Sequence, residues 1–123
     1  MNTKLKGDFG ENAVCDYIIK KGYKIIDRNF HTPYGEIDII AKYNNCMCFI
    51  EVKTRKNSNY GNASEYVDKN KQKKIIESAF IYLGENIDNE IRFDVAEVYY
   101  TENDSLLSVK KINYIENAFI CEE

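Results

Sequence analysis

The sequence predicts a single α/β domain in which helices flank a mixed β-sheet. Its 123 residues suit one domain. Hydrophobic residues make up 44% of the chain and charged residues 30%, which is the balance of an ordinary globular protein and not of a disordered one. Helical and β-like segments follow one another in the order α-β-β-β-α-β-β, which favours helices packed on a mixed sheet.

The first part of the chain is predicted to hold a helix and a strand. Residues 4–21 read as the helix, which Gly22 can end. The apolar residues that recur there at helical spacing are Leu5, Phe9, Ala13, Tyr17 and Ile18. Residues 23–29 are β-like, and residues 31–35 contain Pro and Gly and are predicted to be a turn.

The next two β-like runs, residues 36–43 and 46–54, are predicted to form a hairpin. Only Asn44 and Asn45 separate them, and asparagine tolerates the positive φ that a two-residue turn requires. Glycine and polar residues then mark a loop over residues 56–63.

The C-terminal part is predicted to add a helix and two strands. Ser64 can cap a helix over residues 65–83, and Gly84 can close it. Residues 91–100 and 106–115 are β-like.

Charge and cysteine content narrow the classes of function. No run of about 18 apolar residues and no signal-like N-terminus are present, so we expect no membrane association and a cytoplasmic location with its cysteines reduced. The net charge is −3, but residues 53–74 are strongly basic and residues 85–104 acidic. A local basic segment can contact nucleic acid despite an acidic total, although for a charge run alone a solvated surface is the better explanation.

The hairpin brings acidic residues together if its turn has two residues. This register places Asp38 opposite Glu51, and Glu36 opposite Lys53. Alternation along the strands puts these four side chains on one face. The other face is predicted to carry core residues, namely Ile37, Ile39, Ala41, Ile50 and Val52.

This acidic pair fits a divalent metal site. Carboxylates directly across a hairpin, with Cβ atoms about 5 Å apart, repel each other unless a cation or a proton neutralises them. Mg²⁺ binds one or two carboxylates plus water and phosphate, and the Lys53 ammonium could stabilise charge at a phosphodiester. The alternative is an exposed sheet face of mixed charge, and a one-residue change in the turn would break the register.

Several motifs resemble one bacterial family. They are Gly7-Asp8-Phe9-Gly10-Glu11-Asn12-Ala13, Gly22-Tyr23-Lys24-Ile25-Ile26-Asp27-Arg28-Asn29-Phe30, Gly35-Glu36-Ile37-Asp38-Ile39-Ile40-Ala41, Phe49-Ile50-Glu51-Val52-Lys53-Thr54-Arg55, Lys71-Gln72, Arg92-Phe93-Asp94-Val95 and Ile115-Glu116-Asn117-Ala118-Phe119. In this order they resemble the YraN-like proteins, a branch of the restriction-endonuclease-like superfamily near the Holliday-junction resolvases. The resemblance implies a restriction-endonuclease-like α/β fold.

The resemblance also implies a metal-dependent nuclease site. Its motif, an Asp followed on the next strand by Asp/Glu-x-Lys, falls on Asp38, Glu51 and Lys53. The two acids would bind Mg²⁺ or Mn²⁺, and Lys53 would act on the water or the phosphate. Glu11 matches a further metal-binding and catalytic Glu of the resolvase branch. Ile37 stands where the superfamily's motif has Pro.

The resemblance suggests nucleic-acid contacts as well. The candidates for them are Arg55, Lys71, Gln72 and Lys74. The resulting interpretation is an endonuclease that hydrolyses phosphodiester bonds in DNA, with branched or damaged DNA as candidate substrates. A non-catalytic nucleic-acid-binding or accessory protein that keeps the fold is the alternative. Resolvase relatives act as dimers, so a homodimer is left open.

Overall fold

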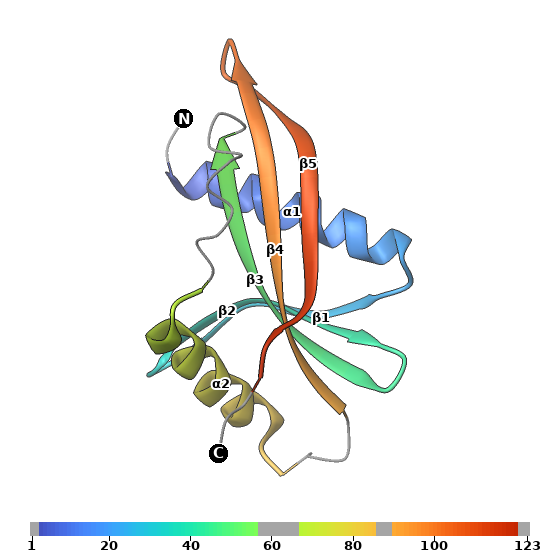
Figure 1. Ribbon diagram of the computed structural model, residues 1–123, viewed down its shortest axis with the longest axis vertical. Helices are drawn as coiled ribbons and strands as arrows, with labels where there is room; N and C mark the ends of the chain where they lie inside the picture. Colours follow the sequence, from blue (N-terminus) through green and yellow to red (C-terminus); the bar gives the residue numbers. More distant parts are fainter. Residues whose placement is uncertain (1–2, 57–66, 86–89, 121–123) are drawn as a thin grey trace.

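The computed structural model describes residues 3–56, 67–85 and 90–120, and these form one five-stranded sheet with two helices (Figure 1). The elements are α1 (Thr3–Lys20), β1 (Lys24–Thr32), β2 (Gly35–Tyr43), β3 (Cys46–Lys56), α2 (Lys69–Leu83), β4 (Glu90–Asn103) and β5 (Leu106–Phe119). The predicted α/β class and element order are confirmed.

The sheet is mixed, with the strands in the order β1-β2-β3-β4-β5. The β3 and β4 strands run parallel, and the other neighbours are antiparallel. A parallel pair needs a crossover connection, and α2 lies within the one that joins β3 to β4. The middle of each of these two strands is buried, as expected for the centre of a covered sheet.

Each face of the sheet carries a core covered by one helix. The α1-side core contains Val14, Cys15, Ile18, Tyr23, Ile39, Ala41, Cys48, Ile50, Ala96 and Val98. The α2-side core contains Ile37, Ile40, Met47, Phe49, Val67, Ile75, Ala79, Leu83, Phe93, Val95 and Phe119. Alternation along β3 divides its residues between the two cores, so Glu51 and Lys53 continue the α2-side row of Met47 and Phe49.

The predicted hairpin register is correct at the turn. Tyr43 pairs with Cys46, and the ladder continues to the pair of Ile39 and Ile50. Asn44 adopts a φ of 54°, in the left-handed region that asparagine tolerates.

The start of the second helix and the face assigned to Ile37 were predicted wrongly. The helix predicted from residue 65 begins at Lys69, because the Asp68 side chain caps it by accepting a hydrogen bond from the Lys71 amide at 2.8 Å. Ser64, the predicted cap, lies outside the described residues. Ile37 was expected on the same face as Ile39, but the two belong to different cores.

The change of face between Ile37 and Ile39 has a local cause. The β2–β3 ladder ends at Ile39, so Asp38 is the first residue of β2 beyond it. On the other neighbour, β1, Asn29 has a left-handed φ of 54° and lies between the partners of Ile39 and Ile37. Both departures from regular pairing meet at Asp38, and simple alternation fails there.

Neither membrane crossing nor disulfide bonding is found in the described part of the chain. No helix within it has the length and apolar character to span a bilayer. Cys15, Cys46 and Cys48 are free thiols, as expected for reduced cysteines, and Cys121 lies outside the described residues.

Gly10 allows α1 to pack closely on β3. A Cβ at this position would clash with the hydroxyl of Thr54 and contact the rest of that side chain. Gly7, one turn earlier on the same helix, has open space at the equivalent position. Only Gly10 is therefore required by packing.

A buried ion pair anchors the end of β5 to β4. The fully buried Asp94 carboxylate accepts two hydrogen bonds from the Arg92 guanidinium at 2.9 Å, and a third from the Asn117 amide at 2.9 Å. Tyr114 also donates its hydroxyl to Asp94. Arg92 reaches outward to the exposed Glu116 at 2.8 Å. Every partner of Asp94 would lose a charged acceptor if this carboxylate were removed.

Opposite effects are expected for alanine at the two glycines. Gly10→Ala should lower the free energy of unfolding by about 1–3 kcal/mol, because the added methyl group overpacks the contact with Thr54. Gly7→Ala should raise it by about 0.5–1 kcal/mol through helix propensity alone. Urea unfolding of both variants measures the difference, and equal effects would contradict the proposed close packing.

Removing the buried charge should be costly. Asp94→Ala leaves Arg92 without its buried partner, so we expect a loss of about 3–5 kcal/mol in the free energy of unfolding. Glu116→Ala removes an exposed partner of the same arginine and should cost less than about 1 kcal/mol. Thermal and urea unfolding of the two variants test this ranking.

Candidate metal centre

The candidate site lies where β2 leaves β3. Beyond the pair of Ile39 and Ile50, the Val52 amide donates to the Asp38 carboxylate at 2.8 Å. The expected cross-strand pairs of Asp38 with Glu51 and of Glu36 with Lys53 therefore lie beyond the regular ladder. The Asp38 carboxylate takes the place of a backbone carbonyl as the acceptor for the Val52 amide. This hydrogen bond fixes the carboxylate beside β3.

Asp38 and Glu51 are close enough to influence each other strongly. Burial, and then the neighbouring Glu51 carboxyl group, raise the pKa of Asp38 to about 8, while the hydrogen bond from Val52 acts in the opposite direction. The Glu51 side chain is only 4% exposed. The two strands thus hold a pair of oxygen ligands that carries excess negative charge when Asp38 is ionised.

Two lysines approach the same oxygen of Glu51. Lys71 Nζ, from the first turn of α2, lies 2.7 Å from Glu51 Oε2, and Lys53 Nζ lies 3.8 Å from it. Partial burial disfavours the charged lysine, but the hydrogen bond and charge of Glu51 raise the pKa of Lys71 overall. The sequence suggested Lys71 as a phosphate contact, and the contact with Glu51 was not foreseen.

Glu11 lies nearby but has its own partner. The Arg28 guanidinium contacts Glu11 Oε1 at 3.3 Å, and burial, opposed by this arginine, raises the pKa of Glu11. Glu11 adds slightly to the rise in the pKa of Asp38 through its charge. Among the described residues no three His, Cys, Asp or Glu side chains are grouped as a metal cluster. The role of Arg28 was missed, because no periodicity or motif connects it with a helix residue 17 positions away.

The donor set fits Mg²⁺ or Mn²⁺ with two protein ligands. Asp38 and Glu51 offer hard carboxylate oxygens, and such ions commonly take one or two carboxylates and fill the remaining positions with water and phosphate. The raised pKa of Asp38 indicates a place where added positive charge is favourable. Glu11 has one carboxylate oxygen, Oε1, in contact with Arg28.

The other predicted residues have different surroundings. Arg55 is 15% exposed and its Nε lies 3.6 Å from the buried Glu97, so this guanidinium is directed into the protein. Gln72 donates its side-chain amide to the Val67 carbonyl at 2.8 Å, which fixes the start of α2. Lys74 is exposed on α2. Of these three residues, Lys74 is the one that lies open to solvent.

A small cleft adjoins the carboxylates. It has a volume of about 370 Å³ and is lined by Gly35, Glu36, Asp68, Asn70, Lys71, Lys74 and Ile75. Glu36 pairs with His31 at 3.3 Å, not with Lys53 as expected. Lys71 lines this cleft and also contacts Glu51, so this one residue links the cleft to the carboxylate site.

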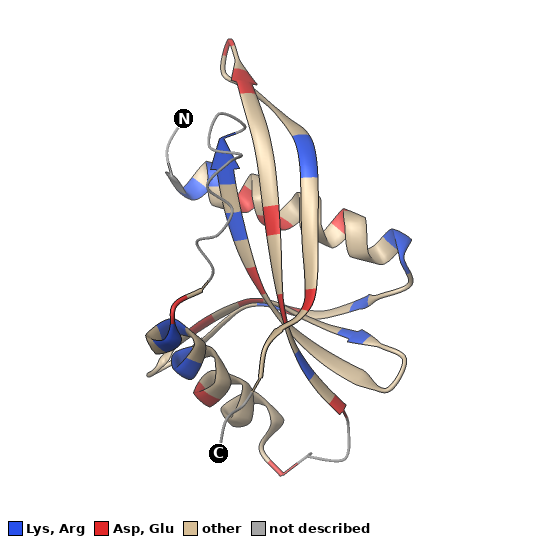
Figure 2. Cartoon of the chain, in the orientation of Figure 1, with Lys and Arg blue, Asp and Glu red and all other residues tan. Residues whose placement is uncertain are grey.

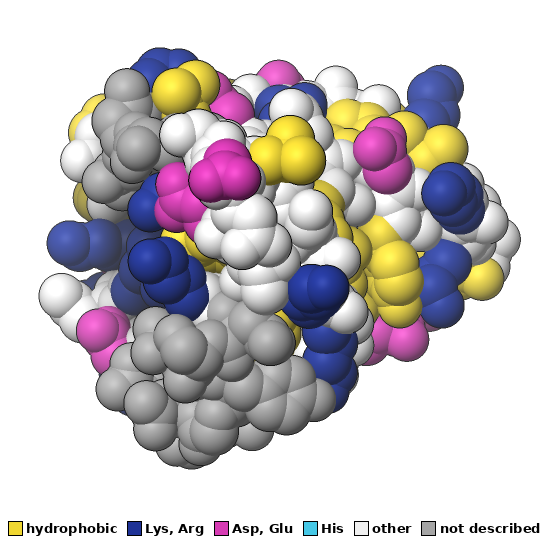
Figure 3. Space-filling model, turned by 90° about the horizontal axis from the view of Figure 1, so that it is seen from above, with side chains coloured by type: hydrophobic (Ala, Val, Ile, Leu, Met, Phe, Trp, Pro, Cys, Tyr) yellow, Lys and Arg dark blue, Asp and Glu magenta, His cyan; other side chains and the backbone are white. Residues whose placement is uncertain are grey.

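Basic residues surround this region. Figure 2 places blue segments on the outer half of β3 and on the first turns of α2, with red segments of β2 and β3 between them. In the space-filling view, Lys and Arg side chains stand at the left, in the lower middle and at the right of the face shown, with acidic side chains among them (Figure 3). The described lysines and arginines of the predicted basic segment are Lys53, Arg55, Lys56, Lys69, Lys71, Lys73 and Lys74.

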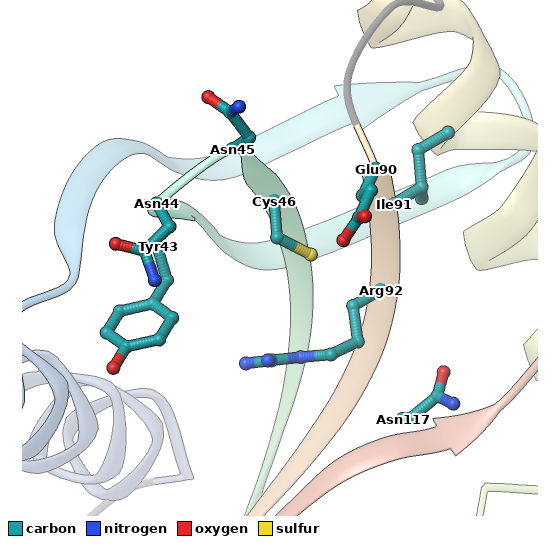
Figure 4. Close-up of a pocket in the computed structure, with 8 residues that line it drawn as sticks. All are labelled: Tyr43, Asn44, Asn45, Cys46, Glu90, Ile91, Arg92 and Asn117. Atoms are coloured by element: carbon teal, nitrogen blue, oxygen red, sulfur yellow. The ribbon is translucent and has the colours of Figure 1, made fainter.

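A larger cavity lies at the opposite end of the hairpin. It has a volume of about 830 Å³ and is lined by Tyr43, Asn44, Asn45, Cys46, Glu90, Ile91, Arg92 and Asn117 (Figure 4). Its one basic side chain, Arg92, is bound to Asp94 and Glu116. Its arginine is therefore already engaged in ion pairs, whereas the exposed Glu90 carboxylate also lines this cavity.

The raised pKa of Asp38 predicts that the stability of the folded protein depends on pH. The folded state keeps its proton up to about pH 8, whereas an unfolded aspartate loses it near 3.8, so stability falls as pH rises through this window. Without metal, Asp38→Asn should unfold a few degrees above the wild type at pH 8 and close to it at pH 4. The substituted amide still offers an oxygen to Val52. Thermal unfolding in EDTA across this range measures the difference, and a gap that does not change with pH would contradict it.

Comparison with known proteins places the chain in a family. The family model of "Uncharacterised protein family UPF0102" matches residues 10–98. UPF0102 proteins of Caldanaerobacter subterraneus subsp. tengcongensis and Clostridioides difficile are 45% and 47% identical over 121 residues, 97% of this chain and 98% and 100% of theirs. A UPF0102 protein of Cytophaga hutchinsonii is 48% identical over 76% of this chain and 83% of its own. The resemblance to the YraN-like proteins is thereby confirmed, and the chain belongs to the uncharacterised protein family UPF0102.

Proposed function

We propose that this protein is a metal-dependent endonuclease that hydrolyses phosphodiester bonds in DNA, with branched and damaged DNA as candidate substrates. One observation carries the proposal: Asp38 and Glu51 meet where β2 leaves β3, with the Lys53 ammonium 3.8 Å from Glu51. This combines a ligand pair for a divalent cation with a positive group that can face a phosphate.

Each residue has a distinct task in this reaction. Asp38 and Glu51 would hold Mg²⁺ or Mn²⁺ through their carboxylate oxygens. An ion held there would lower the pKa of a water molecule and neutralise charge on the phosphate. Lys53 projects from the same face of β3 as Glu51, so its ammonium orients the attacking water or stabilises the charge that develops on the phosphate oxygens.

The surroundings support a nucleic-acid substrate. The cleft of about 370 Å³ beside the carboxylates carries Lys71 and Lys74, and further lysines lie on β3 and α2. Such groups neutralise phosphates and release counterions, so DNA affinity should fall steeply with added salt. Arg55 contributes to the local positive potential from its partly buried position beside Glu97.

A non-catalytic accessory protein is the second candidate. It is favoured by one observation: the carboxylates of Glu51 and Glu11 already have protein cations, Lys71 and Arg28, as partners. Such a protein would bind nucleic acid through its lysines and keep the acids as part of the fold. Loss of Asp38 would then leave DNA binding unchanged.

Cleavage of labelled DNA separates the two candidates. Single-stranded, duplex, flap and four-way-junction DNA are incubated with Mg²⁺, Mn²⁺ or EDTA and with the wild type, Asp38→Asn, Glu51→Gln or Lys53→Ala. We expect metal-dependent cleavage that each substitution reduces by at least about 100-fold. Glu102→Gln is the control, because this acid pairs with Lys6 at 3.7 Å and belongs neither to the carboxylate pair nor to the cleft. Its activity should stay within about threefold of wild type.

The opposite result has a clear meaning. Binding of these DNAs without cleavage under any metal condition, unchanged in Asp38→Asn and Glu51→Gln, would replace the nuclease proposal with the accessory role. Sedimentation of the same samples, with and without junction DNA, tests the homodimer that the sequence left open. Symmetric cleavage of a four-way junction requires two copies of the site.

A further inference from the structure

Lys71 contacts the Glu51 carboxylate, which is one of the two groups proposed to bind the metal. Lys71 Nζ lies 2.7 Å from Glu51 Oε2, which is the short distance of a charge-assisted hydrogen bond. Glu51 is almost fully buried, whereas the lysine side chain is 47% exposed. The lysine therefore reaches the carboxylate from the solvent side, which is also the side from which an ion in solution would approach.

The ammonium group and a divalent cation exclude each other at this carboxylate. A magnesium ion binds a carboxylate oxygen at about 2.1 Å. On either oxygen of Glu51 it would lie only a few ångströms from an ammonium held 2.7 Å from Oε2. Two positive charges this close in a largely buried site repel strongly. A lysine side chain can avoid the repulsion by rotating away, since its four-carbon chain is flexible.

The surroundings of Lys71 provide a place for the released ammonium. Its backbone is fixed, because its amide donates to the Asp68 cap at 2.8 Å. Its side chain lines the cleft of about 370 Å³ together with Lys74. Rotation away from Glu51 would move the charge within this cleft and leave α2 where it is.

We propose that Lys71 acts as an exchangeable cation, which occupies Glu51 in the metal-free protein and yields it to Mg²⁺ or Mn²⁺, and then contacts a DNA phosphate in the cleft. The first part concerns the protein and the metal alone. The second part rests on the proposed function, because it requires that the cleft receives DNA. Lys71 thereby couples metal binding to substrate binding.

Metal affinity tests the first part. Calorimetric titration with Mn²⁺ alone should give a dissociation constant on the order of tenfold lower for Lys71→Met than for the wild type, because the competitor is gone. Lys74→Met is the matched control, one turn along the same helix and lining the same cleft, and should change affinity by less than about twofold. Lys71→Arg restores a competing cation and should return the affinity toward wild type.

Several outcomes would overturn this exchange. Equal or weaker Mn²⁺ binding by Lys71→Met would mean that the lysine does not compete. An equal gain in Mn²⁺ affinity in Lys74→Met would show that the loss of any nearby positive charge causes the effect, and not the loss of Lys71 in particular. Hydrogen exchange provides a second readout that needs no variant: Mn²⁺ should leave the amides of the first turn of α2 protected, since the cap is kept, and loss of that protection would contradict rotation of the side chain alone.

DNA binding tests the second part separately. Lys71→Met should weaken binding of duplex DNA by about tenfold in Ca²⁺, used as a divalent ion for binding measurements, and by less than twofold in EDTA. Lys74→Met should weaken binding equally in both conditions. If Mn²⁺ affinity follows the expected order but no DNA is bound or cleaved, the exchange holds and the proposed function fails. If DNA is cleaved but Mn²⁺ affinity is unchanged in Lys71→Met, the exchange alone fails.

Discussion

The hydrogen bond from the Val52 amide to the Asp38 carboxylate is the interaction on which the site depends. It forms at the point where the β2–β3 ladder ends, so a side chain continues the pairing that the backbone gives up. Without it, a partly buried carboxylate would have no fixed position beside Glu51. The bond therefore positions the Asp38 carboxylate beside β3 at the point where the regular ladder ends.

In the metal-free protein, each acid of the site has its own means of neutralisation. Glu11 has Arg28, Glu51 has Lys71 and the more distant Lys53, and Asp38 retains a proton to higher pH. Each arrangement solves the same problem, which is the cost of removing a carboxylate from water. The neutralising groups here are a half-exposed lysine, an arginine and a proton, whereas the Asp94 carboxylate is fully buried and held by Arg92, Tyr114 and Asn117.

The local parts of the site could be predicted from the sequence, but the contacts between distant elements could not. A two-residue turn of Asn44 and Asn45 determines the register, and alternation then places Glu51 and Lys53 on one face. The same rule failed at Ile37, because it assumes a regular ladder, whereas the β2–β3 ladder ends at Ile39. The contact of Lys71 with Glu51 depends on where α2 returns to the sheet, which no periodicity encodes. The sequence shows that Arg28 is charged, but it does not indicate that its partner is Glu11.

The connectivity of the strands has a consequence for the order of folding. Asp38 and Glu51 belong to a hairpin closed by a two-residue turn, and such short-range contacts form early. The parallel pairing of β3 with β4 needs the whole crossover to close, and Lys71 is carried on that crossover. We therefore expect the hairpin with its two acids and Lys53 to form before Lys71 reaches Glu51. Until then Glu51 lacks its nearer lysine, so we expect the rate at which the chain folds to depend on pH and on the salt concentration.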